Sequence, residues 1–306
     1  MKTYIRLRDG NTIPVLGLGT WKSDKTVVGD AVRCALTKAG YTHIDCASIY
    51  RNEKEIGDVF GEVFGSSIKR DSIFITSKLW NTEHRAEDVE KACKKTLSDL
   101  RLEYLDLYLM HWGIAFPHGE NLEPVDTEGY AVTDTVSIRE TWEAMEGLVK
   151  KGLVKSIGVA NFTTMMLVDL LAYAHILPVM NQVELHPYNT QDSLLAFCQH
   201  HAIAVTAYSP LGRQGADRQG ARVFDEPVVK NLAEKYHKTP AQILLRWGIQ
   251  RGTIVIPKSV TPDRIIENSQ VFDFEMTEED SKEIRVLDNN YRFVDPIGWW
   301  KIPYFV

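Results

Sequence analysis

Four side chains of the kinds used in acid–base catalysis follow three short apolar segments: Asp45, Tyr50, Lys78 and His111. A free phenol has a pKa of about 10, so it is a weak acid at neutral pH. An ammonium group nearby favours the phenolate, which lowers that pKa and makes the phenol a better proton donor. We therefore interpret Tyr50 as a candidate acid with Lys78 as its cationic neighbour. Asp45 would keep the lysine charged, and His111 would donate a second hydrogen bond to developing negative charge.

These side chains can meet only if the segments that carry them end at one place. The chain alternates short apolar segments with amphipathic ones: a helix opened by Asn52 and Glu55 as a capping pair would bury Ile56, Val59 and Phe60 at helical spacing. Such alternation is typical of parallel strands joined by helices. The predicted strands are 17–20, 41–45, 73–77, 105–110, 154–159, 179–183, 204–207 and 254–256.

Eight strands favour closure into a (β/α)8 barrel, and we interpret residues 1–306 as one domain of this kind. Asp9 and Gly10 predict a β-hairpin in front of the barrel. The stretches 112–134 and 209–226 are long and irregular, and each follows a strand. The C-terminal tail from about residue 290 has no helical period, so we expect it to lie as a loop over the barrel mouth and to affect substrate choice more than stability.

Polar or aromatic residues occur at all eight predicted strand ends, where barrels of this class place their active sites. Each one has an ordinary alternative, such as a solvated lysine or a histidine within the core, but eight in succession indicate a site. They are Trp21, Asp45, Lys78, His111, Asn161, Gln182, Tyr208 with Ser209, and Lys258 with Ser259.

The composition is that of an ordinary globular protein, with 44 % hydrophobic and 25 % charged residues among 306. A net charge of −6 and a pI near 5.9 recommend neither nucleic acid nor a membrane surface as a partner. The apolar runs are too short to cross a bilayer, and Met1 leads into charged residues rather than a signal peptide. Four cysteines without paired spacing are consistent with free thiols, so we expect a cytoplasmic protein.

Several segments together resemble the aldo-keto reductases, and most of all their aldose, aldehyde and xylose reductases. Residues 40–57 resemble the first signature of that family. Residues 256–259, with Arg264, Glu267 and Asn268 downstream, resemble its cofactor signature, and 156–162 and 181–184 are similar to the segments between. The resemblance implies a (β/α)8 barrel plugged at the bottom by its hairpin, NADPH bound across the top, and reduction of aldehydes to alcohols.

By the same resemblance, Asp45, Tyr50, Lys78 and His111 match the catalytic residues of the family. Reduction of a carbonyl group by hydride leaves an alkoxide, which needs a proton and, before that, stabilisation of its growing negative charge. The proposed acid, its cationic neighbour and the second hydrogen-bond donor supply these functions.

A cofactor site is predicted near the last strand. Residues 17–22 hold only two glycines of a dinucleotide-binding pattern, so we discard that reading. Thr261 would cap a helix that begins at Pro262, which brings a helix N-terminus close to the cations Lys258 and Arg264. The resemblance implies that the 2′-phosphate of NADPH binds there. The full predicted cofactor set is Thr20, Trp21, Asn161, Gln182, Tyr208, Ser209, Leu211, Lys258, Ser259, Arg264, Glu267 and Asn268.

Four positions and one loop depart from the family pattern. Thr42 stands where the family usually has Arg, which we interpret as a change in the scaffold, and the loop after Leu211 matches no known pattern. Ala160 replaces a usual Ser, and Val260 replaces a common Asn, which removes one contact near the phosphate. We therefore expect NADPH as the cofactor, with NADH as a weaker alternative. Gly113 replaces a frequent Pro and is expected to loosen the loop after His111.

An aromatic pocket is predicted for a small-molecule carbonyl substrate, with no metal. An apolar pocket with one polar anchor suits aromatic or aliphatic aldehydes and open-chain sugars, and the sequence does not choose among them. We expect a monomer or a weak dimer. The predicted pocket residues are Trp21, Trp80, Trp112, Trp299 and Trp300.

Two other classes of protein compete with a reductase. A barrel hydrolase would need paired carboxylates, and Asp45 with Glu184 is the tempting pair, but it leaves Lys78 and Tyr50 idle. The stronger rival is a nucleotide-binding protein of the same family with a structural or regulatory role. Turnover of carbonyl compounds separates it from an enzyme.

Overall fold

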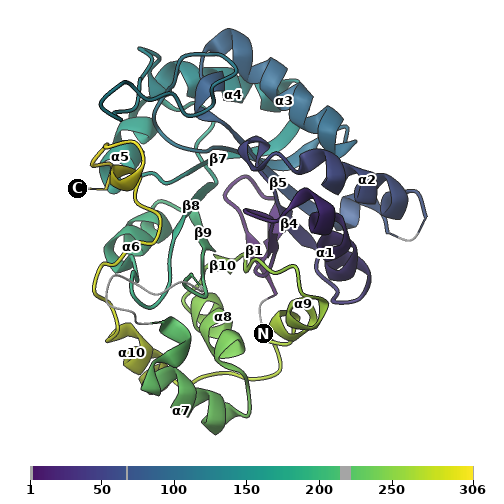
Figure 1. Ribbon diagram of the computed structural model, residues 1–306, viewed down its shortest axis with the longest axis vertical. Helices are drawn as coiled ribbons and strands as arrows, with labels where there is room; N and C mark the ends of the chain where they lie inside the picture. Colours follow the sequence, from purple (N-terminus) through teal and green to yellow (C-terminus); the bar gives the residue numbers. More distant parts are fainter. Residues whose placement is uncertain (1–2, 67, 214–221, 306) are drawn as a thin grey trace.

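The computed structural model describes residues 3–66, 68–213 and 222–305. Eight parallel strands form one sheet in the order β10-β9-β8-β7-β6-β5-β4-β3 (Figure 1). The two outer strands meet, because Leu16 pairs with Val255 and Gly19 with Lys258 in parallel bridges. The sheet therefore closes, and the predicted (β/α)8 barrel is confirmed.

The barrel strands agree with the predicted ones to within about two residues at each end, the usual uncertainty of element boundaries. Strand β5 runs on to Leu79, so Lys78 lies inside the strand instead of following it. The barrel strands are β3 (Leu18–Gly19), β4 (His43–Asp45), β5 (Phe74–Leu79), β6 (Leu105–Met110), β7 (Val154–Ala160), β8 (Met180–Glu184), β9 (Ala204–Tyr208) and β10 (Ile254–Val255).

Helices surround the barrel and bury their apolar faces against the outside of the sheet (Figure 1). They are α1 (Lys25–Thr37), α2 (Glu53–Phe64), α3 (Ala86–Leu100), α4 (Ile138–Lys150), α5 (Thr164–Tyr173), α6 (Asp192–His200), α7 (Pro227–Tyr236), α8 (Pro240–Gln250), α9 (Pro262–Ser269) and α10 (Glu278–Arg285).

Helix α2 begins after Asn52, but the predicted capping pair is wrong. The Asn52 side chain makes no capping hydrogen bond. Its Nδ2 instead donates to the backbone oxygens of Thr20 and Ser23, both at 3.1 Å. The amide therefore holds the turn after β3 against the start of α2, because buried carbonyl groups that need partners lie within its reach.

The N-terminal hairpin of β1 (Tyr4–Arg6) and β2 (Thr12–Pro14) closes the bottom of the barrel. Leu7 and Ile13 are buried in one cluster with barrel side chains such as Leu107 and Ile254. The barrel interior is thus a packed core below the level of the site.

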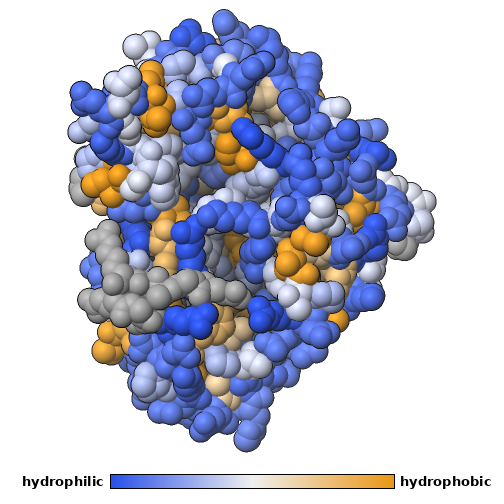
Figure 2. All heavy atoms as spheres, in the orientation of Figure 1, coloured by the Kyte–Doolittle hydropathy of each residue, from blue (hydrophilic) through white to orange (hydrophobic). Residues whose placement is uncertain are grey.

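The irregular segments gather at the other end. The loop 112–134 holds a short bridge between Val125 and Ala131, and the C-terminal tail, residues 289–305, is regular only over the short helix η5 (Pro296–Gly298). Part of the predicted irregular stretch 209–226, residues 214–221, lies outside the described residues. The surface in this orientation is mainly hydrophilic, with apolar groups set apart from one another (Figure 2).

Within the described ranges, no helix is long and apolar enough to cross a membrane. All four cysteines are buried free thiols. The described part of the chain also holds no cluster of three His, Cys, Asp or Glu side chains that could bind a metal ion.

Candidate active site

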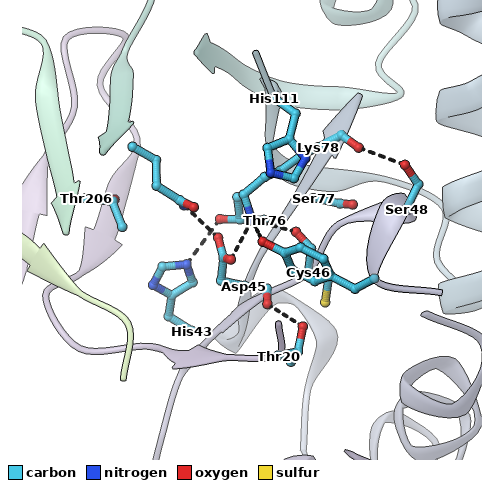
Figure 3. A network of polar contacts seen from close by, with 12 residues as sticks. Thr20, His43, Asp45, Cys46, Ser48, Thr76, Ser77, Lys78, His111 and Thr206 are labelled. Carbon is cyan, nitrogen blue, oxygen red and sulfur yellow. Dashed lines mark hydrogen bonds and ion pairs between the residues drawn. The ribbon is translucent and has the colours of Figure 1, made fainter. Parts of the chain in front are cut away.

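A buried ammonium group forms the centre of the site. Lys78 Nζ donates to Asp45 Oδ1 at 2.6 Å, to the Cys46 carbonyl oxygen at 2.9 Å and to the Tyr50 hydroxyl at 3.3 Å (Figure 3). The Lys78 side chain is fully buried and that of Asp45 is nearly so. Three partners occupy the three donors of the ammonium group, which is what a buried charge requires.

The strand register explains this meeting. Asp45 ends β4 and pairs with Thr76 on β5, two residues before Lys78, so both side chains project into the barrel near its open end. Burial lowers the pKa of Lys78, but the attraction of Asp45 and Tyr50 outweighs it and the pKa is raised. The lysine is therefore charged at neutral pH.

The phenol of Tyr50 differs from the expectation in one respect. Burial raises the pKa of Tyr50 to about 12, although Lys78 pulls it down. The ammonium group thus opposes a larger desolvation effect instead of producing an acid stronger than free phenol. Tyr50 carries its proton at neutral pH and holds it beside a fixed positive charge.

His111 lies next to Lys78 in the same view (Figure 3). Its ring makes edge contacts with Tyr50, at a centroid distance of 5.9 Å, and with Trp80 at 5.2 Å. Burial and the charge of Lys78 hold the pKa of His111 well below its usual range, so the imidazole is neutral. Its Nδ1 is buried without a partner among the described residues.

Amide side chains of later strands brace the same centre. Gln182 Nε2 donates to Asp45 Oδ2 at 2.8 Å, a contact that the sequence did not suggest. Asn161 donates to the His111 carbonyl oxygen at 3.0 Å and accepts from the Tyr208 hydroxyl at 2.8 Å. Asn161 has a left-handed backbone with φ 63°, a conformation that Asn tolerates better than most residues.

One cavity of about 1490 Å³ joins the predicted residues. Lys78 alone of the predicted set does not line it, because that side chain lies beneath Tyr50 with no exposed surface. The predicted residues that line the cavity are Thr20, Trp21, Asp45, Tyr50, Trp80, His111, Trp112, Asn161, Gln182, Tyr208, Ser209, Leu211, Lys258, Ser259, Arg264, Glu267, Asn268, Trp299 and Trp300.

Two cations lie at the α9 end of the cavity. In the described part of the chain, neither Lys258 nor Arg264 forms an ion pair with a carboxylate. Pro262 is the first residue of α9, as predicted, but Thr261 makes no side-chain capping bond, so that expectation is wrong. Ser259 Oγ accepts from the N–H of Thr261 itself at 3.1 Å, which fixes the residue before the helix but does not cap the helix N–H groups.

Aromatic side chains form the opposite end. Trp300 is 1 % exposed and its ring centroid lies 5.3 Å from that of Trp112 and 6.1 Å from that of Trp80. Trp299 is 42 % exposed at the edge of the cavity. Gly113 does not loosen its loop: its N–H, which proline would lack, donates to the Tyr304 hydroxyl at 2.9 Å and ties the loop to the tail.

Two cations are among the lining residues that sequence reasoning missed. Lys22 and Arg213 both place their cations over the Trp21 ring, at 4.8 and 5.1 Å from its centroid. Arg213 also donates to the Phe293 carbonyl oxygen at 3.3 Å. Pro210 and Gly212 indicate a turn before Arg213, but they do not say where the arginine side chain lies, so its place could not be read from the sequence.

Asp45 and Glu184, the pair considered for a hydrolase, are not free to act as catalytic carboxylates. Asp45 is committed to Lys78 and Gln182. Both Glu184 oxygens accept backbone N–H groups of the tail, and the Glu184 side chain has no exposed surface. Two carboxylates bound in this way cannot act as a free acid and base.

The fold is a barrel whose cavity joins a buried centre of Asp45, Lys78, Tyr50 and His111, an end with two cations and an aromatic mouth. The sequence model of the aldo/keto reductase family matches residues 15–289. Aldo-keto reductase family 1 member A1 of Gallus gallus is 51 % identical over 299 residues, covering 96 % of this chain and 91 % of the relative. The Homo sapiens protein of the same name is 49 % identical over 298 residues, with the same coverage.

Among solved structures, the aldose reductase of Schistosoma japonicum superposes with a TM-score of 0.93 at 44 % identity, covering 100 % of this chain and 98 % of that one. The chain belongs to the aldo/keto reductase family. It is an oxidoreductase of a family that acts on small carbonyl compounds with nicotinamide nucleotides.

Proposed function

We propose that this protein reduces aldehydes to alcohols with NADPH, and that Tyr50 is the general acid. The observation that carries the proposal is the 3.3 Å contact between Lys78 Nζ and the Tyr50 hydroxyl at the floor of the cavity. A protonated phenol beside a fixed ammonium group can release its proton to an alkoxide, because the lysine stabilises the phenolate that remains.

His111 supplies the second interaction. The imidazole is neutral and its Nδ1 is enclosed, so we place its proton on Nε2, where it can be donated into the cavity. A carbonyl oxygen held between the Tyr50 hydroxyl and this N–H is polarised before the reaction and stabilised during it. Asp45 does not touch the substrate in this scheme, since it keeps Lys78 charged and in place.

The residues present fit NADPH at both ends of the cavity. Lys258 and Arg264, unpaired with any carboxylate of the described residues, would receive the 2′-phosphate. The Tyr208 ring would lie against the nicotinamide, and Asn161 and Gln182 would bind its carboxamide. When bound, the cofactor supplies the hydride. Because Val260 offers no hydrogen bond beside the phosphate, NADH would serve as a weaker substitute.

The substrate class follows from the aromatic end. Trp80, Trp112 and Trp300 form an apolar wall next to one polar anchor, which suits aromatic and aliphatic aldehydes and the aldehyde form of sugars. A catalytically idle nucleotide-binding relative would have no need of the intact acid–base centre, so we favour the enzyme.

The decisive experiment measures the rate of NADPH oxidation, from the loss of the cofactor's near-ultraviolet absorbance, with each member of a panel of aromatic, aliphatic and sugar aldehydes. Cofactor binding is measured in parallel by quenching of protein fluorescence. We expect turnover that depends on the aldehyde. Tight NADPH binding with no turnover of any panel member would instead support the structural or regulatory alternative.

A further inference from the structure

We propose that Glu184 is a positioning residue: it tethers the C-terminal tail to the barrel and thereby holds the aromatic wall of the substrate pocket in place. This inference rests on the proposed function for its effect on substrates, but the tether itself is a structural claim. Glu184 is the last residue of β8, and Gln182, two positions earlier on that strand, braces Asp45. One strand therefore supports both the catalytic centre and the pocket wall.

Three hydrogen bonds reach the Glu184 carboxylate, and two of them come from the tail. Glu184 Oε1 accepts from the Phe293 N–H at 2.7 Å, and Oε2 accepts from the Val294 N–H at 3.0 Å. His186 Nε2 lies 2.9 Å from Oε1. A carboxylate can only accept, so His186 donates through Nε2, while its Nδ1 has no partner among the described residues.

The buried position makes this carboxylate hard to replace. The side chains of Glu184 and His186 are both 0 % exposed. A buried carboxylate is tolerated only where donors surround it, and buried N–H groups left without an acceptor are costly in turn. The two tail N–H groups and the carboxylate therefore depend on one another.

Neighbouring contacts continue the junction along the chain. The Tyr188 carbonyl oxygen accepts from the Tyr291 N–H at 2.8 Å, and the Thr190 hydroxyl donates to Asp288 Oδ2 at 2.5 Å. The Phe293 ring lies 5.0 Å from that of His186. The segment after β8 is thus the seat on which the start of the tail lies.

Beyond this seat the tail contributes directly to the pocket. Val294, Trp299 and Trp300 line the cavity, and Trp300 packs among Trp80, Trp112 and Phe116. The Trp300 carbonyl oxygen accepts from the Ala131 N–H at 3.0 Å, so the tail in turn supports the loop 112–134. Loss of the Glu184 tether releases the chain immediately before these residues.

The chain offers a matched control in Glu146 of α4. Glu146 is 2 % exposed, and its Oε1 accepts from the consecutive N–H groups of His175 and Ile176 at 2.8 and 2.9 Å. A histidine, His175, again lies beside the carboxylate. This glutamate makes the same kind of buried contact, but the segment that it binds, residues 175–176, does not line the cavity, whereas the tail bound by Glu184 does.

The experiment compares Glu184→Ala and Glu146→Ala in the full chain by amide hydrogen exchange. We expect the amides of residues 290–300 to exchange at least about tenfold faster in Glu184→Ala, because the anchoring acceptor is gone. In Glu146→Ala the same acceleration should be confined to residues near 175. Glu184→Gln is the conservative variant: it retains one acceptor oxygen, so one tail N–H keeps a partner and the acceleration should be intermediate.

The functional readout is the ratio of kcat/KM for a bulky aromatic aldehyde to kcat/KM for propanal. We expect Glu184→Ala to lower this ratio at least about tenfold, the scale of lost contacts in an apolar pocket. Glu146→Ala should leave the ratio unchanged. In a Trp300→Ala background the effect of Glu184→Ala on the ratio should largely vanish, because both changes act through the tail.

Tail exchange at the wild-type rate in both Glu184 variants, or an equal change of ratio in Glu146→Ala, would overturn the proposal. The exchange measurement needs no turnover. If the wild type reduces no aldehyde, the proposed function fails while the tether is still decided by exchange. If reduction proceeds and the tail is not released, the tether fails alone.

Discussion

Two buried carboxylates at strand ends, Asp45 on β4 and Glu184 on β8, hold very different structures in place. Asp45 binds an ammonium group on the next strand and an amide of the same barrel. Glu184 binds backbone N–H groups 109 and 110 residues further along the chain. The first carboxylate joins parts that the sheet already holds together, whereas the second joins the sheet to a segment with almost no regular structure.

Under the proposed function, the region around Asp45 serves the chemical step, and the region held by Glu184 serves the choice of substrate. Around Asp45, both side-chain partners, Lys78 and Gln182, lie on strands of the same sheet, so the sheet fixes their positions. Around Glu184, position depends on a few local contacts, and the aromatic wall beyond them can vary without disturbing the barrel. We therefore expect changes at the first site to affect the rate with every substrate and changes at the second to affect the choice among substrates.

The largest effect is expected from Tyr50→Phe, which tests the rigid side of this comparison. Loss of the proposed acid should lower kcat at least about 10²-fold for all aldehydes alike. The ring contact with His111 remains, so the fold and NADPH affinity should be retained. Steady-state kinetics and a cofactor titration check both points. Near wild-type reduction of a good aldehyde would remove Tyr50 from the mechanism.

A slightly smaller effect is expected from Lys78→Met, which tests whether the ammonium group acts through Tyr50. Because Lys78 lowers the pKa of Tyr50, its loss should raise that pKa further and move the alkaline limb of the reduction profile to higher pH. The substitution strands the Asp45 carboxylate, so Lys78→Met with Asp45→Asn serves as the control for stability. An unshifted limb in both variants would show that Lys78 is structural.

A selective loss is expected from Arg264→Ala at the far end of the cavity. Each charge-assisted bond to the 2′-phosphate contributes roughly 1.5–3 kcal/mol, so NADPH should bind roughly ten- to a hundredfold more weakly. NADH should be nearly indifferent. Titrations of both cofactors at fixed ionic strength measure this, with Arg139→Ala, an exposed arginine outside the cavity, as the control. Equal weakening of both cofactors would show that our placement of the phosphate is wrong.

The smallest effect on activity is expected from Glu53→Gln. This variant tests the pH dependence of folding stability at a buried carboxyl group that binds Ser77, the residue before Lys78. Glu53 is buried and accepts from Ser77 at 2.5 Å and from Thr96 at 3.1 Å. Burial raises the pKa of the Glu53 carboxyl to about 7 from its ordinary value of 4.5. The unfolded chain therefore releases this proton at lower pH than the folded protein does, and folding stability falls as pH rises from about 4.5 to about 7.

Glutamine at this position cannot ionise, so Glu53→Gln should lose less stability over that interval than the wild type, by at most about 3 kcal/mol. Urea midpoints at pH 5 and pH 8 measure the difference. Glu279→Gln, at an exposed position of α10, is the control. If the wild type and Glu53→Gln follow the same pH dependence, Glu53 is ionised in the folded protein throughout.

The barrel itself could be predicted because its signals are local. Short apolar strands and amphipathic helices follow from side-chain periodicity. Because the ends of parallel strands in a closed barrel lie together, Asp45 and His111 could be placed in one site from the sequence alone. The caps could not be predicted as well. Asn52 and Thr261 have the right residue types for capping, but the Asn52 amide donates to distant backbone oxygens instead, and the Thr261 side chain makes no capping bond.

The tail shows the limit of sequence reasoning most clearly. Its lack of periodicity indicates a loop correctly, and the expectation that the tail affects substrate choice more than stability stays a prediction. The structure adds a contribution to stability that the sequence did not indicate, because Trp300 is 1 % exposed and both oxygens of the buried Glu184 carboxylate accept tail N–H groups. Neither contact has a local signature, since each joins residues far apart in the chain. Truncation would expose a core cluster and strand a buried carboxylate.

The hairpin closes one end of the barrel. Leu7 and Ile13 fill its lower end, so the described residues leave no passage along the barrel axis. Under the proposed function, cofactor and substrate would therefore enter and leave from the side of the cavity, where a ligand bound further out would slow the exchange of one bound further in. The tail lines that cavity, so it would help to set how long the inner ligand stays bound.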